Sequence, residues 1–269
     1  MAEKSIMELM NLKGRTAAIT GASGALGKIF AKSLAEVGAN LILIDIDESS
    51  LAVQGNTLKQ EWGVDVATYN CDLENSNDRN GLISAILSDH SCLNILVNNA
   101  ALVGSSNLVG WSVPFEEQSL DAWNRALEIN LTSVFHLSQG LTPLLRNSEG
   151  ANIINIASIY GFLGPDWGLY DQTNLSNPAG YSASKGGLIQ LSRWMATTIG
   201  PQVRVNTISP GGILRDQPKS FIDKYQKRTP LNRMAQEEDI IGALVFLATD
   251  LSQYVTGEMI TVDGGWSAW

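Results

Sequence analysis

The sequence predicts an α/β fold, a single-domain Rossmann-type doubly wound parallel sheet, from three observations. Short apolar runs of strand length alternate along the 269 residues with longer segments in which apolar side chains recur at helical spacing. A glycine-rich turn joins the first run to the first helical segment. Hydrophobic residues make up 44% of the chain and charged residues 17%, which is enough apolar material for one continuous core. Because no internal repeat or proline- and glycine-rich linker interrupts this alternation, we expect one domain over residues 1–269.

The apolar runs have the length of buried strands and are separated by helical or turn-forming segments. They lie at residues 15–20, 41–44, 64–70, 93–97, 152–156, 203–208 and 259–262. Strands that alternate with helices of this length indicate a parallel sheet covered on both faces.

Helical spacing of apolar residues marks the segments between these strands. The first helices are expected at residues 27–37, 51–62 and 82–87. A longer helix follows Ser119, whose hydroxyl can accept a hydrogen bond from a first-turn N–H group. Its apolar positions at helical spacing are Leu120, Trp123, Leu127 and Leu131. Another helix begins at Tyr181.

The charge and the termini exclude several classes of partner. The formal net charge is −9 and the pI is about 4.7. An acidic surface repels phosphate backbones and anionic lipids, so neither nucleic acid nor a membrane is expected as a partner. The first residues, MAEKSIMELMNLKGR, contain no apolar signal segment, and no apolar run approaches the ~20 residues that span a bilayer.

Cysteine and histidine are too few to suggest a metal site. Cys71 and Cys92 do not have the spacing of a metal or redox motif, so we expect free thiols and a cytoplasmic protein. His90 and His136 are the only histidines, which argues against a histidine-rich site.

The turn after the first strand has the composition of a phosphate-binding loop. A phosphate needs backbone N–H groups at a helix N-terminus, and large side chains there would block its approach. Glycines at positions 21, 24 and 27 would provide the tight turn, the close approach and the contact between helix and sheet. An ordinary glycine-rich turn is the alternative. The residues expected to contact a dinucleotide here are Gly21, Ser23, Gly24, Ala25, Leu26 and Gly27.

The second strand ends in Asp45, 18 residues after Gly27. A carboxylate at this place can accept hydrogen bonds from both ribose hydroxyls of an adenosine, and it would repel a 2′-phosphate. The next residue, Ile46, offers no compensating cation. These residues predict NAD rather than NADP as cofactor, with a solvated strand-end acid as the alternative.

Two later strand ends carry further candidate cofactor contacts. Asp72 and Leu73 follow the third strand and could bracket the adenine. Asn99 and Ala100 follow the fourth, and buried amides cost free energy unless they are hydrogen-bonded. Ligands of open α/β sheets bind at the carboxyl ends of strands, although these side chains could also serve only to satisfy loop backbone.

Tyr181 and Lys185 form a candidate catalytic pair. Their i to i+4 spacing places them on one face of a helix, one turn apart. A free phenol has a pKa of about 10, and a nearby ammonium should lower it, as should a bound nicotinamide cation. Ser158, after the fifth strand, could hold the substrate oxygen beside the tyrosine. Taken alone, such a pair is usually a solvated helix surface, but it occurs here with the glycine loop and a strand-end serine.

With these residues the chain resembles the short-chain dehydrogenase/reductase family, in its compact single-domain branch. The resemblance extends from the glycine loop at 20–27 to Pro210-Gly211 and the closing Val262-Asp263-Gly264-Gly265. It implies that Tyr181 is the general acid/base, that Ser158 orients the reacting oxygen, and that Lys185 tunes the tyrosine and binds the nicotinamide ribose. It further implies a water held by Asn130 in a proton relay, and places Pro210, Gly211 and Ile213 against the nicotinamide. Homotetramers or homodimers are expected, with Trp266 and Trp269 packing across an interface.

The chain departs from the family pattern around the expected substrate site. Ala25 stands where the compact branch usually has a glycine, and Ser158 and Tyr181 are 23 positions apart, more than the family usually shows. The extra material forms a loop near 164–179. Its candidate substrate contacts are Trp167, Tyr170 and Gln172, because aromatic faces and amides suit a sugar or polyol. Packing on a neighbouring subunit is the alternative.

Arg215 replaces a threonine that the family often has after Pro210-Gly211. Its guanidinium could bind a substrate phosphate or carboxylate, or form a salt bridge with Asp216 or Glu238. Residues 215–234 are expected to form a mobile lid.

The sequence therefore predicts an NAD-dependent oxidoreductase that transfers hydride between nicotinamide and a secondary alcohol or carbonyl of a sugar or polyol. The resemblance extends to bacterial members linked to surface-sugar or flagellin glycan biosynthesis. The alternatives are a reductase of a small carbonyl or acyl substrate and a non-catalytic NAD-binding sensor. An intact set of tyrosine, lysine and serine argues against a sensor.

Overall fold

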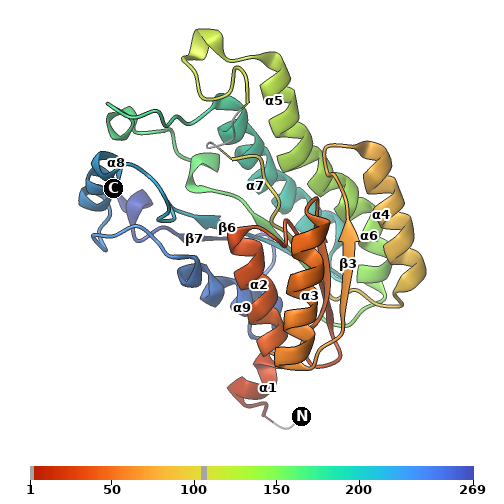
Figure 1. Ribbon diagram of the computed structural model, residues 1–269. Helices are drawn as coiled ribbons and strands as arrows, with labels where there is room; N and C mark the ends of the chain where they lie inside the picture. Colours follow the sequence, from red (N-terminus) through yellow and green to blue (C-terminus); the bar gives the residue numbers. More distant parts are fainter. Residues whose placement is uncertain (1–2, 104–107) are drawn as a thin grey trace.

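Parallel strands in the order β3-β2-β1-β4-β5-β6-β7 form the centre of the computed structural model, which describes residues 3–103 and 108–269 (Figure 1). The strands are β1 Thr16–Thr20, β2 Asn40–Asp45, β3 Val66–Asn70, β4 Ile95–Asn98, β5 Asn152–Ile156, β6 Arg204–Pro210 and β7 Met259–Val262. The helices are α1 Ile6–Met10, α2 Ala25–Glu36, α3 Glu48–Trp62, α4 Ser76–Asp89, α5 Leu120–Leu127, α6 Ser133–Arg146, α7 Ala179–Ile199, α8 Lys219–Arg228 and α9 Ile241–Ala248. The predicted doubly wound parallel sheet is confirmed. Residues 1–2 of the N-terminal stretch considered above lie outside the described residues.

Helices cover both faces of the sheet (Figure 1). Successive side chains of a strand point to opposite faces, so each strand contributes to two cores. Ala17 and Ile19 of β1 pack with side chains of α2, α3 and α9, whereas Ala18 between them packs with α4, α6 and α7. All three are fully buried, which explains why the strands are apolar without alternation.

The strand order reverses between β1 and β4. From β1 the chain adds β2 and β3 toward one edge, and it then returns to place β4 on the other side of β1. The loops that follow β1 and β4 diverge at this point and leave a crevice at the carboxyl ends of the strands. Gly21, Asp45, Asp72, Asn99 and Ser158 of the candidate site lie at or just after the carboxyl ends of strands, whereas Asn130, Tyr181 and Lys185 lie on helical segments.

The helix predicted after Ser119 begins as expected but differs further on. The Ser119 hydroxyl accepts a hydrogen bond from Ala122 N at 3.1 Å and caps α5. A π-helical turn, Glu128–Thr132, then joins α5 to α6. The buried positions of α5 are Ala122 and Ala126, whereas Leu120 is 76% exposed. The expected apolar stripe is therefore wrong at Leu120, because α5 packs closely against α7 through its small residues.

Other features bear on the class of protein. No helix in the described ranges has the length and apolar character needed to cross a membrane. Cys71 is buried, Cys92 is partly buried, and both are unpaired. Within the same ranges, no three histidine, cysteine, aspartate or glutamate side chains are grouped as metal ligands would be.

Candidate active site

The glycine loop between β1 and α2 requires glycine at two positions for steric reasons. Gly21 has a φ of +63°, and a Cβ there would lie 2.8 Å from the Cα of Ala100. A Cβ on Gly27 would lie 2.0 Å from the carbonyl oxygen of Gly21. Gly24 is the N-cap residue of α2 and has no side chain to cap it. First-turn N–H groups of α2 therefore remain available to an anion, which is the arrangement that binds a pyrophosphate.

Hydrogen bonds from the end of β4 hold this loop in place. The Thr20 hydroxyl accepts from the backbone N–H groups of Asn99 and Ala100, at 3.0 and 3.1 Å. The Asn99 amide in turn donates to the carbonyl oxygens of Thr20 and Gly21, at 2.9 and 3.0 Å. The Asn99 side chain thus satisfies backbone groups of the loop, which is the alternative given for it in the sequence analysis.

Asp45 lies at the same edge as the glycine loop. One carboxylate oxygen accepts from Ser23 N at 2.9 Å and the other from Asp47 N at 3.1 Å. The carboxylate is partly exposed, and each oxygen keeps a lone pair for a further donor. Ile46 beside it is largely exposed.

A groove of about 620 Å³, called here the strand-end groove, runs along the carboxyl ends of the strands. Its lining includes most of the residues predicted to contact a dinucleotide: Gly21, Ser23, Gly24, Ala25, Leu26, Asp45, Ile46, Asp72, Leu73, Asn99 and Ala100. Gly27 lies buried beneath the loop. The groove also contains Arg125, which the sequence analysis missed. Its guanidinium binds Glu74 through two hydrogen bonds of 2.7 and 2.8 Å, a long-range pair that no local spacing indicates.

A second cavity of about 460 Å³, the tyrosine pocket, contains Ser158, Tyr181 and Lys185. Pro210, Gly211 and Ile213, expected at the nicotinamide, line it as well. The tyrosine pocket and the strand-end groove share wall residues, so the two form one continuous cleft. These shared residues are Leu26, Asn99, Ala101, Val103 and Arg215. The cleft can therefore hold an extended dinucleotide with one end at Asp45 and the other at Tyr181.

The electrostatics of the catalytic pair differ from the expectation. Burial raises the pKa of Tyr181, and a hydrogen bond with Ser158 opposes this rise. Burial also lowers the pKa of Lys185 to about 8. The Lys185 ammonium lies 5.8 Å from the centre of the tyrosine ring and donates to the carbonyl oxygen of Ile156 at 2.7 Å. The predicted lowering of the tyrosine pKa by the lysine is thus wrong for the protein by itself, because desolvation of the phenolate outweighs a cation directed elsewhere.

Asn130 is completely buried in the π-helical turn. Its amide oxygen accepts from Leu102 N at 2.7 Å, and its amide nitrogen donates to Leu102 O at 3.1 Å and to the Ser184 hydroxyl at 3.0 Å. Both N–H donors of the side chain are therefore used. The side chain connects the loop after β4 to the turn of α7 that carries Lys185, so it positions the candidate catalytic pair. The predicted water relay stays a prediction.

The candidate substrate residues are not brought together in one place. Tyr170 and Arg215 line the tyrosine pocket, whereas Trp167 lines a neighbouring cavity. Gln172 is exposed with a φ of +64° and is absent from the lining of both cavities. Arg215 does form an ion pair, at 3.3 Å, but its partner is Glu237. The predicted partners Asp216 and Glu238 are therefore wrong: the fold places the turn Glu237–Ile240 beside this arginine, and within that turn Glu237 is the residue that reaches it.

The loop near residues 164–179 packs against residues 215–234, the segment predicted to be a lid. The Lys224 ammonium of α8 donates to Gly168 O at 2.7 Å, and Arg228 pairs with Asp166 at 3.1 Å. Phe221 of α8 lies against the ring of Tyr170, with ring centres 5.5 Å apart, and both line the tyrosine pocket. The buried part of the insertion thus packs on its own chain.

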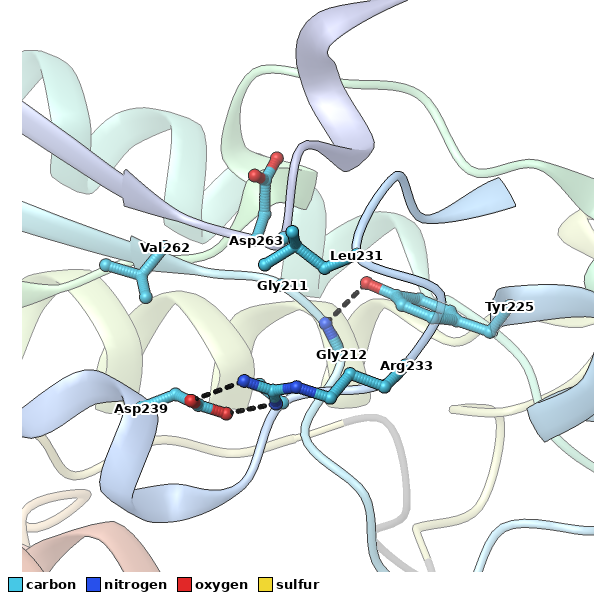
Figure 2. A pocket seen from close by; sticks show the side chains of 10 residues that line it. Gly211, Gly212, Tyr225, Leu231, Arg233, Asp239, Val262 and Asp263 are labelled. Atoms are coloured by element: carbon cyan, nitrogen blue, oxygen red, sulfur yellow. Dashed lines mark hydrogen bonds and ion pairs between the residues drawn. The ribbon is translucent and has the colours of Figure 1, made fainter. Parts of the chain in front are cut away.

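Tyr225 connects α8 to the turn after β6. Its hydroxyl accepts from Gly212 N at 2.6 Å, next to Gly211 (Figure 2). Its ring stacks on Trp266, with centres 4.3 Å apart and planes inclined by 18°. Trp266 is buried within the chain by this contact, and the packing of the two terminal tryptophans across a subunit interface stays a prediction. Trp269 remains largely exposed.

Comparisons with known proteins agree with this geometry. The family described as enoyl-(acyl carrier protein) reductase matches residues 21–267. The post-translational flagellin modification protein A of Campylobacter coli is 30% identical over 257 residues, covering 95% of this chain and 99% of that protein. The 2-dehydro-3-deoxy-D-gluconate 5-dehydrogenase of Pseudoalteromonas atlantica is 31% identical over 271 residues, covering 97% and 99%. A solved gluconate 5-dehydrogenase from Burkholderia cenocepacia J2315, in complex with NADP and tartrate, gives a TM-score of 0.86 at 26% identity, covering 98% of this chain and 100% of that one.

Three findings agree. The glycine loop lies where the strand order reverses, a buried tyrosine and lysine lie at the far end of the same cleft, and the family match covers nearly the whole chain. The chain belongs to the short-chain dehydrogenase/reductase family of oxidoreductases, which bind a nicotinamide cofactor.

Proposed function

We propose that the protein is an NAD-dependent dehydrogenase that acts on a secondary hydroxyl group of a polyhydroxylated acid, such as a sugar acid. The observation that carries this proposal is the tyrosine pocket, in which Ser158, Tyr181 and Lys185 share one cavity with the guanidinium of Arg215. The first three residues provide acid/base chemistry at a hydroxyl, and the fourth provides a cation for a carboxylate or phosphate on the same molecule.

The chain's own groups divide the reaction between them. Bound NAD supplies the acceptor for hydride from the substrate carbon. The Ser158 hydroxyl hydrogen-bonds the substrate oxygen, and the Tyr181 phenolate takes the proton from that oxygen as the carbonyl forms. The Lys185 ammonium lies near the Tyr181 ring and would also lie near the ribose of the bound nicotinamide. Together with the positive charge of the nicotinamide, it would favour the phenolate form of Tyr181. Reduction follows the same path in reverse.

The cofactor preference rests on Asp45. Its carboxylate lies in the strand-end groove, where it would accept from ribose hydroxyls and repel a 2′-phosphate. The NADP in the Burkholderia structure belongs to that protein. We expect Asp45→Ser to lower the ratio of kcat/KM for NAD to that for NADP by roughly tenfold to a hundredfold, the loss of a hydrogen bond to a charged group. Initial rates with both cofactors measure this ratio.

Asp47→Asn is the matched control for the cofactor experiment. Asp47 also lies at the groove, but its carboxylate caps α3 through Ser50 N at 3.0 Å. If the control changed the ratio as much as Asp45→Ser, general charge at this edge would determine the preference, and the assignment to Asp45 would be wrong.

The substrate class rests on Arg215. Of two proteins similar to this chain, one is named for a gluconate derivative and the other for gluconate, and the second was solved with tartrate, a hydroxylated dicarboxylate. Arg215 is held by Glu237 with its side chain about half exposed, so it can exchange that partner for a ligand anion. We expect Arg215→Leu to raise KM for gluconate by about tenfold to a hundredfold and to leave kcat/KM for a neutral polyol such as sorbitol nearly unchanged.

A panel of sugar acids and neutral polyols, followed by the absorbance of reduced NAD, tests the substrate class. Arg146→Leu, on the exposed end of α6, is the control for loss of one arginine. Equal losses on gluconate and sorbitol would show that Arg215 does not recognise the anion. Turnover of acyl thioesters without turnover of any polyol would favour the rival acyl reductase. Tight NAD binding without any turnover would favour the sensor.

We further propose that the protein works as a homotetramer or homodimer in the cytoplasm, with a small-molecule substrate and neither nucleic acid nor membrane as partner. Phe135 of α6 and Trp194 of α7 are exposed large apolar side chains near the helices that carry Asn130 and Tyr181. Burying them between copies would favour association. Sedimentation equilibrium distinguishes this assembly from a monomer.

A further inference from the structure

A third cavity, the outer chamber, has a volume of about 970 Å³ and lies between two segments that are distant in sequence. One wall comes from residues 112–123 before and within α5, and the other from residues 165–183, which contain the inserted loop and the start of α7. The described residues of its walls include Phe115, Gln118, Trp123, Trp167, Asn174 and Asn177.

The outer chamber adjoins the tyrosine pocket, because Leu175 and Ser176 line both. The tyrosine pocket measures about 460 Å³, and its walls include Pro210, Gly211 and Ile213, the residues expected at the nicotinamide. A bound nicotinamide therefore leaves space only for the reacting end of a substrate. The remainder of a larger substrate would have to extend past Leu175 and Ser176 into the outer chamber.

The lining of the outer chamber differs in chemistry from that of the tyrosine pocket. None of the described residues that line it carries a charge, whereas the tyrosine pocket contains Lys185, Arg215 and Asp216. Two of its aromatic rings, Phe115 and Trp167, are 78% and 56% exposed on opposite walls. A ligand between them would cover these apolar faces, which supplies a favourable binding free energy.

The chamber also offers uncharged hydrogen-bonding groups. Asn177 is only 5% exposed, and its amide nitrogen has no hydrogen-bond partner among the described residues. The nitrogen itself has less than 1 Å² of exposed surface, so a ligand oxygen would reach it only after the side chain turns toward the chamber, and that contact would recover the free energy that the unpaired donor costs. Gln118 uses its amide oxygen to accept from Ala179 N at 3.0 Å, which holds the two walls together at the start of α7. An acyl chain in this place would remove water from the exposed amide of Asn174 and offer it no hydrogen-bond partner.

We propose that the outer chamber binds an uncharged sugar ring that belongs to the same substrate molecule, while the tyrosine pocket holds the anionic part that is oxidised. The C–H faces of a pyranose pack on Phe115 and Trp167, and its hydroxyl and ring oxygens meet the amides. This inference rests on the proposed function for the identity of the reacting end. The substrate is then a glycoside or oligosaccharide that carries an acidic residue, larger than a free monosaccharide acid.

Binding of cellobiose to the NAD-loaded Tyr181→Phe protein tests the chamber without catalysis. Cellobiose is neutral and presents flat apolar ring faces with equatorial hydroxyls. We expect saturable binding by isothermal titration calorimetry, and we expect Trp167→Ala and Phe115→Ala, one from each wall, each to weaken it by roughly fivefold or more. Because both side chains are largely exposed, neither substitution should unfold the protein.

Trp269→Ala is the matched control, since Trp269 is an exposed tryptophan outside the chamber lining, and it should change the cellobiose affinity by less than about twofold. No saturable binding up to about 100 mM cellobiose, equal binding with and without Trp167, or binding of n-octanol in place of cellobiose would each overturn the proposal. Failure of the proposed dehydrogenase would appear separately, as absence of sugar-acid turnover by the wild type, which this binding measurement does not use.

Discussion

Tyr181→Phe should lower kcat for alcohol oxidation by about a thousandfold, while the dissociation constant of NAD changes by less than about twofold. The substitution removes the phenol oxygen that is proposed to take the substrate proton and keeps the ring that lines the tyrosine pocket. NAD is expected to depend on the strand-end groove and on Lys185, which the substitution leaves in place. Steady-state kinetics and a fluorescence titration with NAD measure the two effects.

The pH dependence gives the Tyr181 experiment a second readout. Because burial raises the pKa of Tyr181, little phenolate is present near neutrality, and oxidation by the wild type should become faster as the pH rises toward about 8. Lys185, whose pKa is lowered to about 8, still carries its charge below that pH. The residual rate of the phenylalanine variant should lack this rise.

Tyr69→Phe is the matched control for loss of a hydrogen-bonded phenol. Tyr69 lies on β3, outside the lining of the tyrosine pocket, and its hydroxyl donates to Asp89 at 2.9 Å. The control should retain the wild-type rate. Retention of more than about a tenth of the wild-type kcat by Tyr181→Phe would exclude the tyrosine as the general base.

Gly27→Ala should lower NAD affinity by more than about a hundredfold and reduce the melting temperature by about 5–10 °C. The new Cβ would lie 2.0 Å from Gly21 O and 2.7 Å from the Cα of Ala22, both backbone atoms of the phosphate loop. Neither can rotate away as a side chain could, so α2 must move from the sheet or the loop must change shape. Differential scanning fluorimetry with and without NAD measures stability and binding together.

Gly81→Ala is the control for adding a methyl group to a helical glycine. Gly81 lies in α4 with no atom within 4 Å of a Cβ, so alanine should leave NAD affinity unchanged and stabilise the helix by up to about 1 kcal/mol. A Gly27→Ala protein that bound NAD normally would show that the loop tolerates the displacement, and the steric argument would fail.

Much of the fold and the cofactor site could be predicted from local sequence because the relevant signals are short-range. Apolar runs indicate buried strands wherever they fold, and parallel connection puts all their carboxyl ends at one edge. Asp45 and Asn99 therefore reach the same groove although they are far apart in the chain. The i to i+4 spacing of Tyr181 and Lys185 likewise determines that they share one helix face.

The remaining features of the fold and the site depend on which distant segments pack together, and local sequence patterns do not indicate this. Helical spacing predicted that Leu120 lies on the buried face of its helix. It could not show that the small side chains of α5, Ala122 and Ala126, are the ones that face α7. Arg215 pairs with Glu237 rather than with its sequence neighbour Asp216, because the fold places the turn Glu237–Ile240 beside the arginine. Burial, a property of the whole fold, sets the direction of the Tyr181 pKa against the effect expected from the nearby lysine.

The sequence by itself determined the parallel sheet, the glycine loop between β1 and α2, and the shared helix face of Tyr181 and Lys185, since each follows from a local pattern in the chain. Only the tertiary structure decided that the loop near residues 164–179 packs on α8, that Trp266 stacks on Tyr225, and that Trp167, Tyr170 and Arg215 line two adjoining cavities whereas Gln172 lines neither. Cavities and ion pairs form between segments far apart in the chain, so their composition is decided only when those segments meet.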